Sequence, residues 1–275
     1  MNKKIKNGVT IMTFDSLEKL GVKHCFSTKL GGVSEGVYES MNLGFNRGDS
    51  DENVQSNFER MAAALGVDKN CMCLSQQTHT TNVRVMTKED AGNGIVRLLP
   101  YTDVDGMITD VKGMTLVTFY ADCVPLYFYD PVKQVIGLSH SGWRGTVGKI
   151  GKNTIELMCK TYGCNISDIK CCIGPSICKD CYEVSEDVIE QFEAAFGKEL
   201  VHESGMVIPS TLHPGEPGKY MLDLWKANET VFLEAGISRE NIEITDYCTH
   251  CRPELFYSHR IMGAKRGSLA AFLCL

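Results

Sequence analysis

Short strand-like runs dominate this chain, and their arrangement constrains the fold more than any other feature. Ten segments of six to eight residues are rich in Val, Ile, Thr and aromatic residues and are bounded by Gly, Asp or Pro. Apolar residues spaced three and four apart predict helices over 51–65, 146–162, 184–197 and 220–235. Strands and helices alternate without the regular βαβ rhythm of a Rossmann or TIM fold. We therefore predict an α/β (α+β) protein with mixed β-sheets flanked by helices, forming a single domain over residues 1–275.

Composition excludes several classes of function. The formal net charge is −6, which argues against a binder of nucleic acid, whose footprint is a strongly basic face. The longest apolar window, "MTLVTFYADCVPLYFYD", is interrupted by an aspartate and a proline, so it does not predict a membrane span. The N-terminal lysines are not followed by the apolar segment of a signal peptide. We therefore expect a cytoplasmic protein, in which most of the 13 cysteines are reduced and buried.

Three candidate metal ligands stand where apolar runs end or bend. These are His79 in "SQQTHTTN", Cys123 in "FYADCVPLYF" and His140 in "GLSHSGW". Two imidazoles and one thiolate suit zinc with a fourth position open for water or substrate. Each residue alone could also be an ordinary loop or core side chain. The neighbours favour a site, because Asp122 lies inside an apolar run and Pro125 interrupts a strand pattern that otherwise reads as central.

The turn after His140 is typical of an anion contact but not of a nucleotide-binding P-loop. "GWRGTVGK" places five residues between Gly142 and Gly148, and Ile150 follows the lysine where a P-loop needs Ser or Thr. A glycine-rich turn that enters a helix can still present backbone amides to an anion. Arg144 would add a planar, bidentate charge there.

A second set of cysteines is a rival metal site. Two segments, "CCIGPSICKDC" and "CTHC", carry the following residues: Cys171, Cys172, Cys178, Cys181, Cys248, His250 and Cys251. One Cys-x-x-Cys pair from each segment could form a structural zinc site. The pairs are separated by 67 residues, from Cys181 to Cys248, and no other sequence feature links them.

The chain resembles the laccase-domain (multicopper polyphenol oxidase-like) proteins. The resemblance runs through "FSTKLGGVSEGVYESMNLGFNRGD", "LSQQTH", "DGMITD", "ADCVPL", "GLSHSGWRG" and "IGPSICKDCYEV". The ordered set of Gln-x-His, Ala-Asp-Cys-x-Pro and His-x-Gly-Trp-Arg-Gly is specific. Members of this family are described as purine nucleoside phosphorylases with adenosine deaminase activity, and some bacterial members as peptidoglycan editing factors.

The resemblance implies both a site and a reaction. His79, Cys123 and His140 correspond to the family's metal-binding and catalytic residues, with zinc as the expected cofactor and copper as a possible one. The implied substrates are phosphate and a purine nucleoside, namely adenosine, inosine or S-methyl-5′-thioadenosine. Phosphorolysis would yield the free base and ribose 1-phosphate, and a zinc-activated water would deaminate adenosine.

Four further residues are candidate substrate contacts. Lys29, Arg47 and Arg144 could hold phosphate, although the family commonly has arginine where this chain has Lys29, and lysine lacks the bidentate fork. Gln77 lies two residues before His79 and would share its side of an extended segment. The family's C-terminal arginine motif reads "YSHRIMGAKRG" here, so no role is transferred to that region.

A proton carrier for deamination is not evident from the sequence. Asp122 is adjacent to the candidate ligand Cys123, but neighbouring residues on a strand face opposite sides. We therefore expect the Asp122 side chain to point away from the metal.

Three alternatives remain open from the sequence. Cys123 could be the nucleophile or metal ligand of an amide hydrolase acting on a peptidoglycan precursor, with His79 or His140 as its base. The chain could be a metal-binding partner protein without enzymatic activity. The family label also suggests a copper-dependent polyphenol oxidase (laccase), but only seven histidines are present and none forms the His-x-His pairs of a multicopper site.

Overall fold

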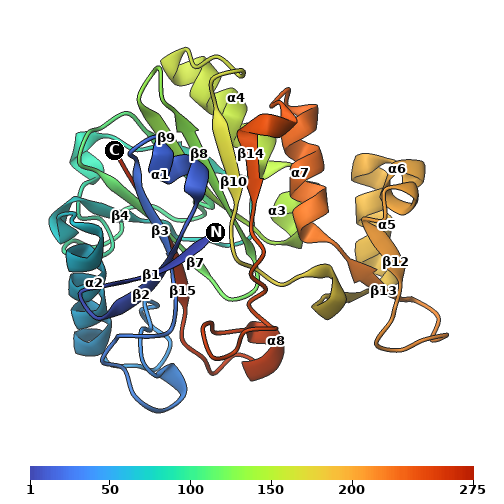
Figure 1. The fold of residues 1–275 in the computed structure, drawn as a ribbon, viewed down its shortest axis with the longest axis horizontal. Coiled ribbons are helices and arrows are strands. Elements are labelled where there is room, and N and C mark those ends of the chain that lie inside the picture. The colour runs from blue at the N-terminus through green and yellow to red at the C-terminus, as the bar shows by residue number, and fades with distance from the viewer.

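The computed structural model describes residues 1–275 and confirms an α/β fold with mixed sheets flanked by helices (Figure 1). The first sheet has the order β1-β2-β3-β15-β7-β4. Its β4–β7 pair is parallel and its other pairs are antiparallel. Its strands are β1 (Asn2–Lys6), β2 (Val9–Thr13), β3 (Lys23–Ser27), β4 (Met72–Leu74), β7 (Thr115–Tyr120) and β15 (Leu269–Cys274).

The second sheet has the order β14-β10-β8-β9-β6-β5, with parallel pairs at its two edges. Its strands are β5 (Val83–Val85), β6 (Gly106–Thr109), β8 (Val124–Asp130), β9 (Val135–Ser141), β10 (Lys170–Ile173) and β14 (Ile242–Ile244). A small third sheet, ordered β11-β13-β12, consists of β11 (Glu183–Ser185), β12 (Val207–Pro209) and β13 (Lys219–Leu222). Mixed strand directions exclude a Rossmann or TIM architecture, as the sequence predicts.

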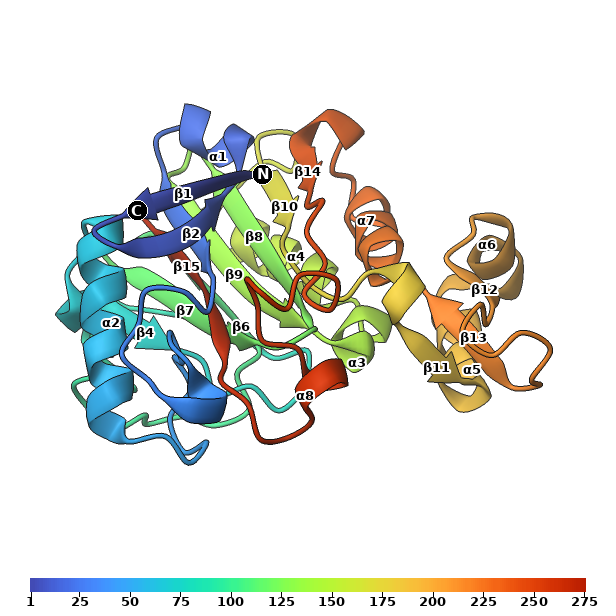
Figure 2. The same cartoon turned by 60° about the horizontal axis from the view of Figure 1, so that its bottom comes forward.

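The structure has eight α-helices. They are α1 (Asp15–Lys19), α2 (Asp51–Leu65), α3 (Trp143–Val147), α4 (Ile150–Tyr162), α5 (Glu186–Phe196), α6 (Lys198–Glu203), α7 (Leu224–Glu234) and α8 (His259–Met262). Helix α2 packs on the first sheet, whereas α4 and α7 pack on the second. Helices α5 and α6 and the third sheet form a lobe beside the main body (Figures 1 and 2). None of these helices is long and apolar enough to cross a lipid bilayer.

One hydrophobic cluster contains side chains from both six-stranded sheets. Phe26 and Leu116 of the first sheet and Tyr127 and Leu138 of the second belong to one buried cluster. A second cluster joins the second sheet to α4, α5 and α7, and a third joins the first sheet to α2. Sheet faces that are buried on both sides explain why so many strands are continuous apolar runs in the sequence.

The helix boundaries follow local signals in two places and depart from the prediction in others. Helix α2 begins after Ser50, whose side chain accepts from the Asn53 amide, and ends at Gly66 in the left-handed conformation. The helix predicted over 146–162 is instead two helices, because Lys149 adopts φ +56° between them. The helices predicted from 184 and 220 begin later, since β11 and β13 occupy their first residues.

Candidate active site and metal centre

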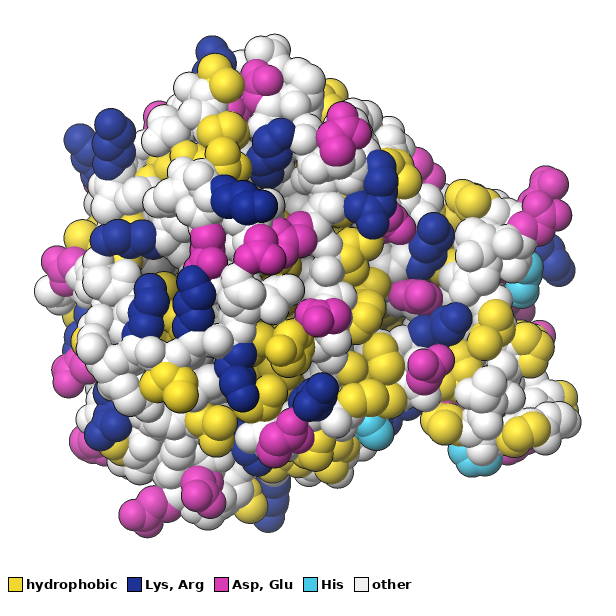
Figure 3. Space-filling view, in the orientation of Figure 1, with side chains coloured by type: hydrophobic (Ala, Val, Ile, Leu, Met, Phe, Trp, Pro, Cys, Tyr) yellow, Lys and Arg dark blue, Asp and Glu magenta, His cyan; other side chains and the backbone are white.

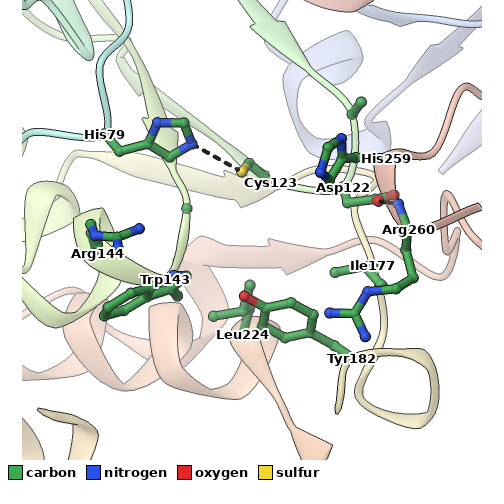
Figure 4. A pocket seen from close by; sticks show the side chains of 12 residues that line it. His79, Asp122, Cys123, Trp143, Arg144, Ile177, Tyr182, Leu224, His259 and Arg260 are labelled. Atoms are coloured by element: carbon green, nitrogen blue, oxygen red, sulfur yellow. Dashed lines mark hydrogen bonds between the residues drawn. The ribbon is translucent and has the colours of Figure 1, made fainter. Parts of the chain in front are cut away.

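The structure brings together the three predicted metal ligands His79, Cys123 and His140, here called the three-ligand site. Their donor atoms all lie within 4.8 Å of one another. Cys123 Sγ lies 3.9 Å from His79 Nε2 (Figure 4). The ring centroids of His79 and His140 are 4.9 Å apart, with a T-shaped orientation. A tetrahedral zinc ion with bonds of about 2.3 Å to sulfur and 2.0–2.1 Å to nitrogen places these two ligand types about 3.6 Å apart. The donor set therefore fits one zinc ion.

Sheet register explains why ligands distant in sequence meet. His140 is the penultimate residue of β9 and pairs with Pro125 of β8, so Cys123 lies directly beyond the same end of the sheet. The turn that carries Cys123 from β7 to β8 contains Asp122 at φ +85°. His79 itself has φ +64°. Two non-glycine residues in the left-handed region at one site are typical of a functional constraint on the backbone.

Pro125 is accommodated without breaking the ladder. Its carbonyl accepts from the Gly174 amide at 2.8 Å, so its backbone polar atoms face the end of β10. The residue of β8 next to Pro125, Leu126, is the last that pairs with β10, where it lies opposite Ile173. The missing N–H of proline is consequently not required by β9.

Asp105 is fully buried next to the three-ligand site, and its hydrogen bonds hold two of the three ligands in place. Its carboxylate accepts hydrogen bonds from the backbone amides of Thr78 (3.0 Å), His79 (3.1 Å) and Thr80 (2.9 Å). It also accepts from the Nδ1 of His140 at 2.8 Å. The first set of bonds holds the strained turn at His79, and the last leaves His140 Nε2 free to ligate a metal.

The charges within the site favour a thiolate. Burial opposes ionisation of Cys123, but the positive charge of His140 and hydrogen bonds from both imidazoles lower the pKa of this thiol to about 6. Burial likewise opposes the charged form of His140, whereas the Cys123 charge and the Asp105 hydrogen bond raise the pKa of the imidazole to about 9. Burial opposes ionisation of Asp105 too, but hydrogen bonding and charge from His140 outweigh it and lower the pKa of this carboxyl to about 2. A thiolate is the form that binds a metal ion or acts as a nucleophile.

Gly142 is the residue that lets the ligands approach the following turn. A Cβ at this position would lie 2.9 Å from His79 Cδ2 and 3.2 Å from Cys123 Sγ. Any larger residue would therefore displace a ligand side chain. The glycine in "HSGWRG" is explained by this close approach rather than by an unusual backbone angle, since its φ is −71°.

A pocket opens in front of His79 and Cys123 (Figure 4). Trp143 and Tyr182 contribute aromatic rings to its wall, and two guanidinium groups, those of Arg144 and Arg260, lie against these rings. Arg144 Cζ is 4.1 Å from the Trp143 ring centroid, and Arg260 Cζ is 5.2 Å from that of Tyr182. Aromatic faces beside cationic groups suit a ligand that combines a planar ring with an anion.

The other predicted substrate contacts lie outside the residues that line this pocket. The Gln77 side chain bonds both backbone groups of Phe119, at 2.6 and 2.7 Å, and so ties its segment to β7. The Lys29 backbone bridges to Leu255, and its side chain is half-buried. Arg47 is exposed on a loop held by the Tyr38 hydroxyl. Of the four predicted contacts, only Arg144 lines the pocket.

Four residues of the site carry no role in the sequence-based prediction. Asp105 opens the strand-like run "DGMITD", where an acid reads as a strand boundary. Tyr182 lies among cysteines, and His259 and Arg260 fall where the chain departs from the pattern that it resembles. The Asp122 carboxylate accepts from the Arg260 amide at 2.7 Å and so fixes the start of α8.

A second group of possible metal ligands lies apart from the first. It comprises four thiols and is here called the four-thiol cluster: Cys178, Cys181, Cys248 and Cys251. Their sulfur atoms also lie within 4.8 Å of one another. Cys171 and Cys172 are buried in β10 and take no part in it. The structure therefore unites the two Cys-x-x-Cys pairs that no sequence feature linked.

Comparison with known proteins relates most of the chain to one family. A family described as "Multi-copper polyphenol oxidoreductase laccase" matches residues 23–275. The purine nucleoside phosphorylase YlmD of Bacillus subtilis is 36% identical over 251 residues, covering 90% of this chain and 86% of that protein. The adenosine deaminase RL5 of an unknown prokaryotic organism is 34% identical, covering 88% and 90%. The crystal structure of YlmD from Geobacillus stearothermophilus superposes with a TM-score of 0.86 at 33% identity, covering 97% and 96%.

Proposed function

This chain belongs to the multi-copper polyphenol oxidoreductase laccase family, and from that premise we propose that it is a zinc-dependent purine nucleoside enzyme. The proposed reactions are phosphorolysis of adenosine, inosine and S-methyl-5′-thioadenosine, and deamination of adenosine. The names of the relatives as purine nucleoside phosphorylase and adenosine deaminase support these reactions. The observation that carries the proposal is the convergence of His79, Cys123 and His140 beside a pocket with two aromatic rings and two arginines.

The ligand set favours zinc over copper. Two histidines and one cysteine also occur in blue-copper proteins, where a weak axial ligand such as methionine completes the site. No methionine lines this pocket, and Gly142, which has no side chain, lies against His79 and Cys123. Three protein ligands with an open position are the pattern of catalytic zinc. When bound, zinc would supply an activated water at neutral pH.

The remaining residues have separate roles in holding the substrate. The rings of Trp143 and Tyr182 would stack on the purine, because aromatic faces bind planar bases without needing specific polar contacts. Arg144 and Arg260 would hold phosphate, since the guanidinium fork matches phosphate oxygens bidentately. The four side chains line the same pocket, so a base and a phosphate could be held at once (Figure 4).

His259 is the proposed proton carrier of this pocket. Its Nδ1 lies 3.1 Å from the Gly263 carbonyl, and because a carbonyl only accepts, Nδ1 carries the hydrogen. Nε2 is then left as an acceptor that can take a proton from a reacting group and return it. The Asp122 carboxylate is less suited to this role, because it already accepts bonds from Thr249, Ser258 and Arg260.

The test is a product analysis with metal-quantified protein. Adenosine and inosine are incubated with and without phosphate, and bases and nucleosides are separated by chromatography. We expect phosphate-dependent release of adenine and hypoxanthine and phosphate-independent conversion of adenosine to inosine, with both lost in His79→Ala. Zinc-loaded protein that gives neither product would overturn the proposal.

The low pKa of Cys123 also favours a second candidate function, an amide hydrolase with a cysteine nucleophile acting on a peptidoglycan precursor. The Cys123→Ala variant separates the two. If this variant loses both its zinc and its nucleoside turnover, Cys123 is a metal ligand. Full retention of zinc with loss of hydrolysis of a muropeptide amide would identify it as a nucleophile.

A further inference from the structure

The four-thiol cluster joins two chain segments that the sheet brings side by side. Strands β10 and β14 pair in parallel, with Ile173 beside Ile244, and both segments continue in the same direction beyond them. Ser176 and Cys248 then form an isolated parallel β-bridge, and the Thr249 amide donates a hydrogen bond to the Ser176 carbonyl. The two Cys-x-x-Cys turns follow directly on these contacts.

The arrangement of the four sulfur atoms fits one tetrahedral ion. Zinc–sulfur bonds of about 2.3 Å place the sulfurs of a tetrahedral site about 3.8 Å apart. The Sγ atoms of Cys181 and Cys251 are 3.4 Å apart, and all four lie within 4.8 Å of one another. A polynuclear iron–sulfur cluster needs wider spacing, because several irons and sulfides lie between its cysteines.

Backbone amides already point at one of the sulfurs. The amides of Cys178 and Cys251 lie 3.2 and 3.4 Å from the Sγ of Cys248. Amides directed at a sulfur stabilise a thiolate, which is the form that ligates zinc. Cys248 is buried, whereas Cys251 is exposed and gives an ion a way in.

We propose that the four-thiol cluster is a second, structural zinc site that fastens these two segments together. It supplies four sulfur ligands, so no coordination position is left for water or substrate. Cys178 and Cys181 lie just before β11, where the chain passes from the main body into the α5–α6 lobe (Figure 1). Hydrophobic side chains flank this junction, with basic and acidic side chains between them (Figure 3).

The two fastened segments also form part of the pocket wall. Ile177 precedes Cys178 and Tyr182 follows Cys181, and both line the pocket. In the other segment, the Thr249 hydroxyl donates to Asp122 at 2.7 Å. A zinc ion at the four-thiol cluster therefore positions pocket residues without contacting the substrate.

The experiment isolates this site by removing the other one. In a His79→Ala/His140→Ala protein, we expect about one zinc per chain to remain, with X-ray absorption showing four sulfur neighbours at about 2.3 Å. The unmodified protein should hold about two zinc ions, each in its own site. Remaining zinc with nitrogen or oxygen neighbours, or no remaining zinc, would overturn the proposal.

A cysteine variant provides the reciprocal test. Cys178→Ser/Cys181→Ser should lower the zinc content by about one ion per chain, whereas Cys71→Ser/Cys159→Ser, which alters half-buried thiols outside both groups, should leave it unchanged. If the first variant does not fold, the absorption spectrum of the His79→Ala/His140→Ala protein still decides. Iron in place of zinc, or disulfides detected by intact mass as pairs of missing hydrogens, would also refute a structural zinc.

Discussion

The three-ligand site and the four-thiol cluster differ in ligand number, not in burial. Each has one buried ligand, His140 or Cys248, and one exposed ligand, His79 or Cys251. The three-ligand site offers three donors and borders a pocket, whereas none of the thiols of the four-thiol cluster lines it. Three ligands leave a coordination position for chemistry, and four close it. Exposure of a ligand is therefore a poor guide to catalysis, and the count of donors beside a cavity is a better one.

Removing a ligand from the three-ligand site should have the largest effect on activity. We expect His140→Ala to lower nucleoside turnover by at least about 10³-fold, because loss of the metal removes several kcal/mol of transition-state stabilisation. Steady-state kinetics and zinc analysis measure both consequences. The control is His202→Ala, on α6 and paired with Glu193, which should retain full activity. If nucleoside turnover persists after the metal of the three-ligand site is lost, that site is not catalytic, and the two sites would not differ in function as proposed.

The next effect concerns the carboxylate beneath the three-ligand site. Asp105→Asn cannot accept all the hydrogen bonds that the carboxylate receives, so we expect about 10- to 100-fold weaker metal binding at this site. Competition with a chromophoric chelator measures this affinity. Asp103→Asn, at an exposed position that bonds only the Thr78 hydroxyl, is the matched control. Equal weakening of metal binding at the three-ligand site and at the four-thiol cluster would show that Asp105 serves the fold in general.

Much of the fold follows from local sequence signals. The long strand-like runs are strands, because burial on both faces makes them continuous in apolar residues. Helix ends at Gly66 and Gly163 follow from their left-handed conformation. The small third sheet was not predicted, because its strands of three or four residues are too short to show a clear hydrophobic period. The break at Lys149, with φ +56°, was not predicted, although the glycines at 145, 148 and 151 around it are poor helix formers.

The two sites were unequally predictable for a physical reason. Cys123 and His140 stand at the ends of the paired strands β8 and β9 beside unusual neighbours, whereas His79 lies in the segment between β4 and β5. The pairs of the four-thiol cluster meet only because β10 and β14 lie in parallel, with Cys171 beside Ile242, and no local pattern encodes that pairing. The role of Asp105 was not predicted, because in the sequence a single acidic residue before an apolar run resembles a strand boundary. Its role becomes evident only from its hydrogen bonds in the structure.

A smaller effect should follow from crowding the three-ligand site. In Gly142→Ala the new Cβ would meet His79 Cδ2 at 2.9 Å, so a ligand must shift by several tenths of an ångström. We expect about a 10- to 100-fold loss of kcat/KM, because misplacement near 1 Å costs about that much. Gly145→Ala is the control, since its Cβ meets nothing closer than 3.4 Å. A Gly142→Ala enzyme with normal kinetics and normal zinc content would mean that the ligands tolerate displacement.

The smallest effect is expected where the four-thiol cluster keeps its ligand number. Cys251→His replaces an exposed thiol with an imidazole, and three cysteines with one histidine are an established structural zinc set, as four cysteines are. We expect zinc to be retained and Tm to fall by only about 2–4 °C, equivalent to about 1 kcal/mol in a chain of this size. Cys251→Ala, which leaves three ligands and an open position, should release zinc far more readily to a chelator. If the two variants retain zinc equally well, the fourth donor is dispensable. A complete set of four ligands would then no longer distinguish this cluster from the three-ligand site.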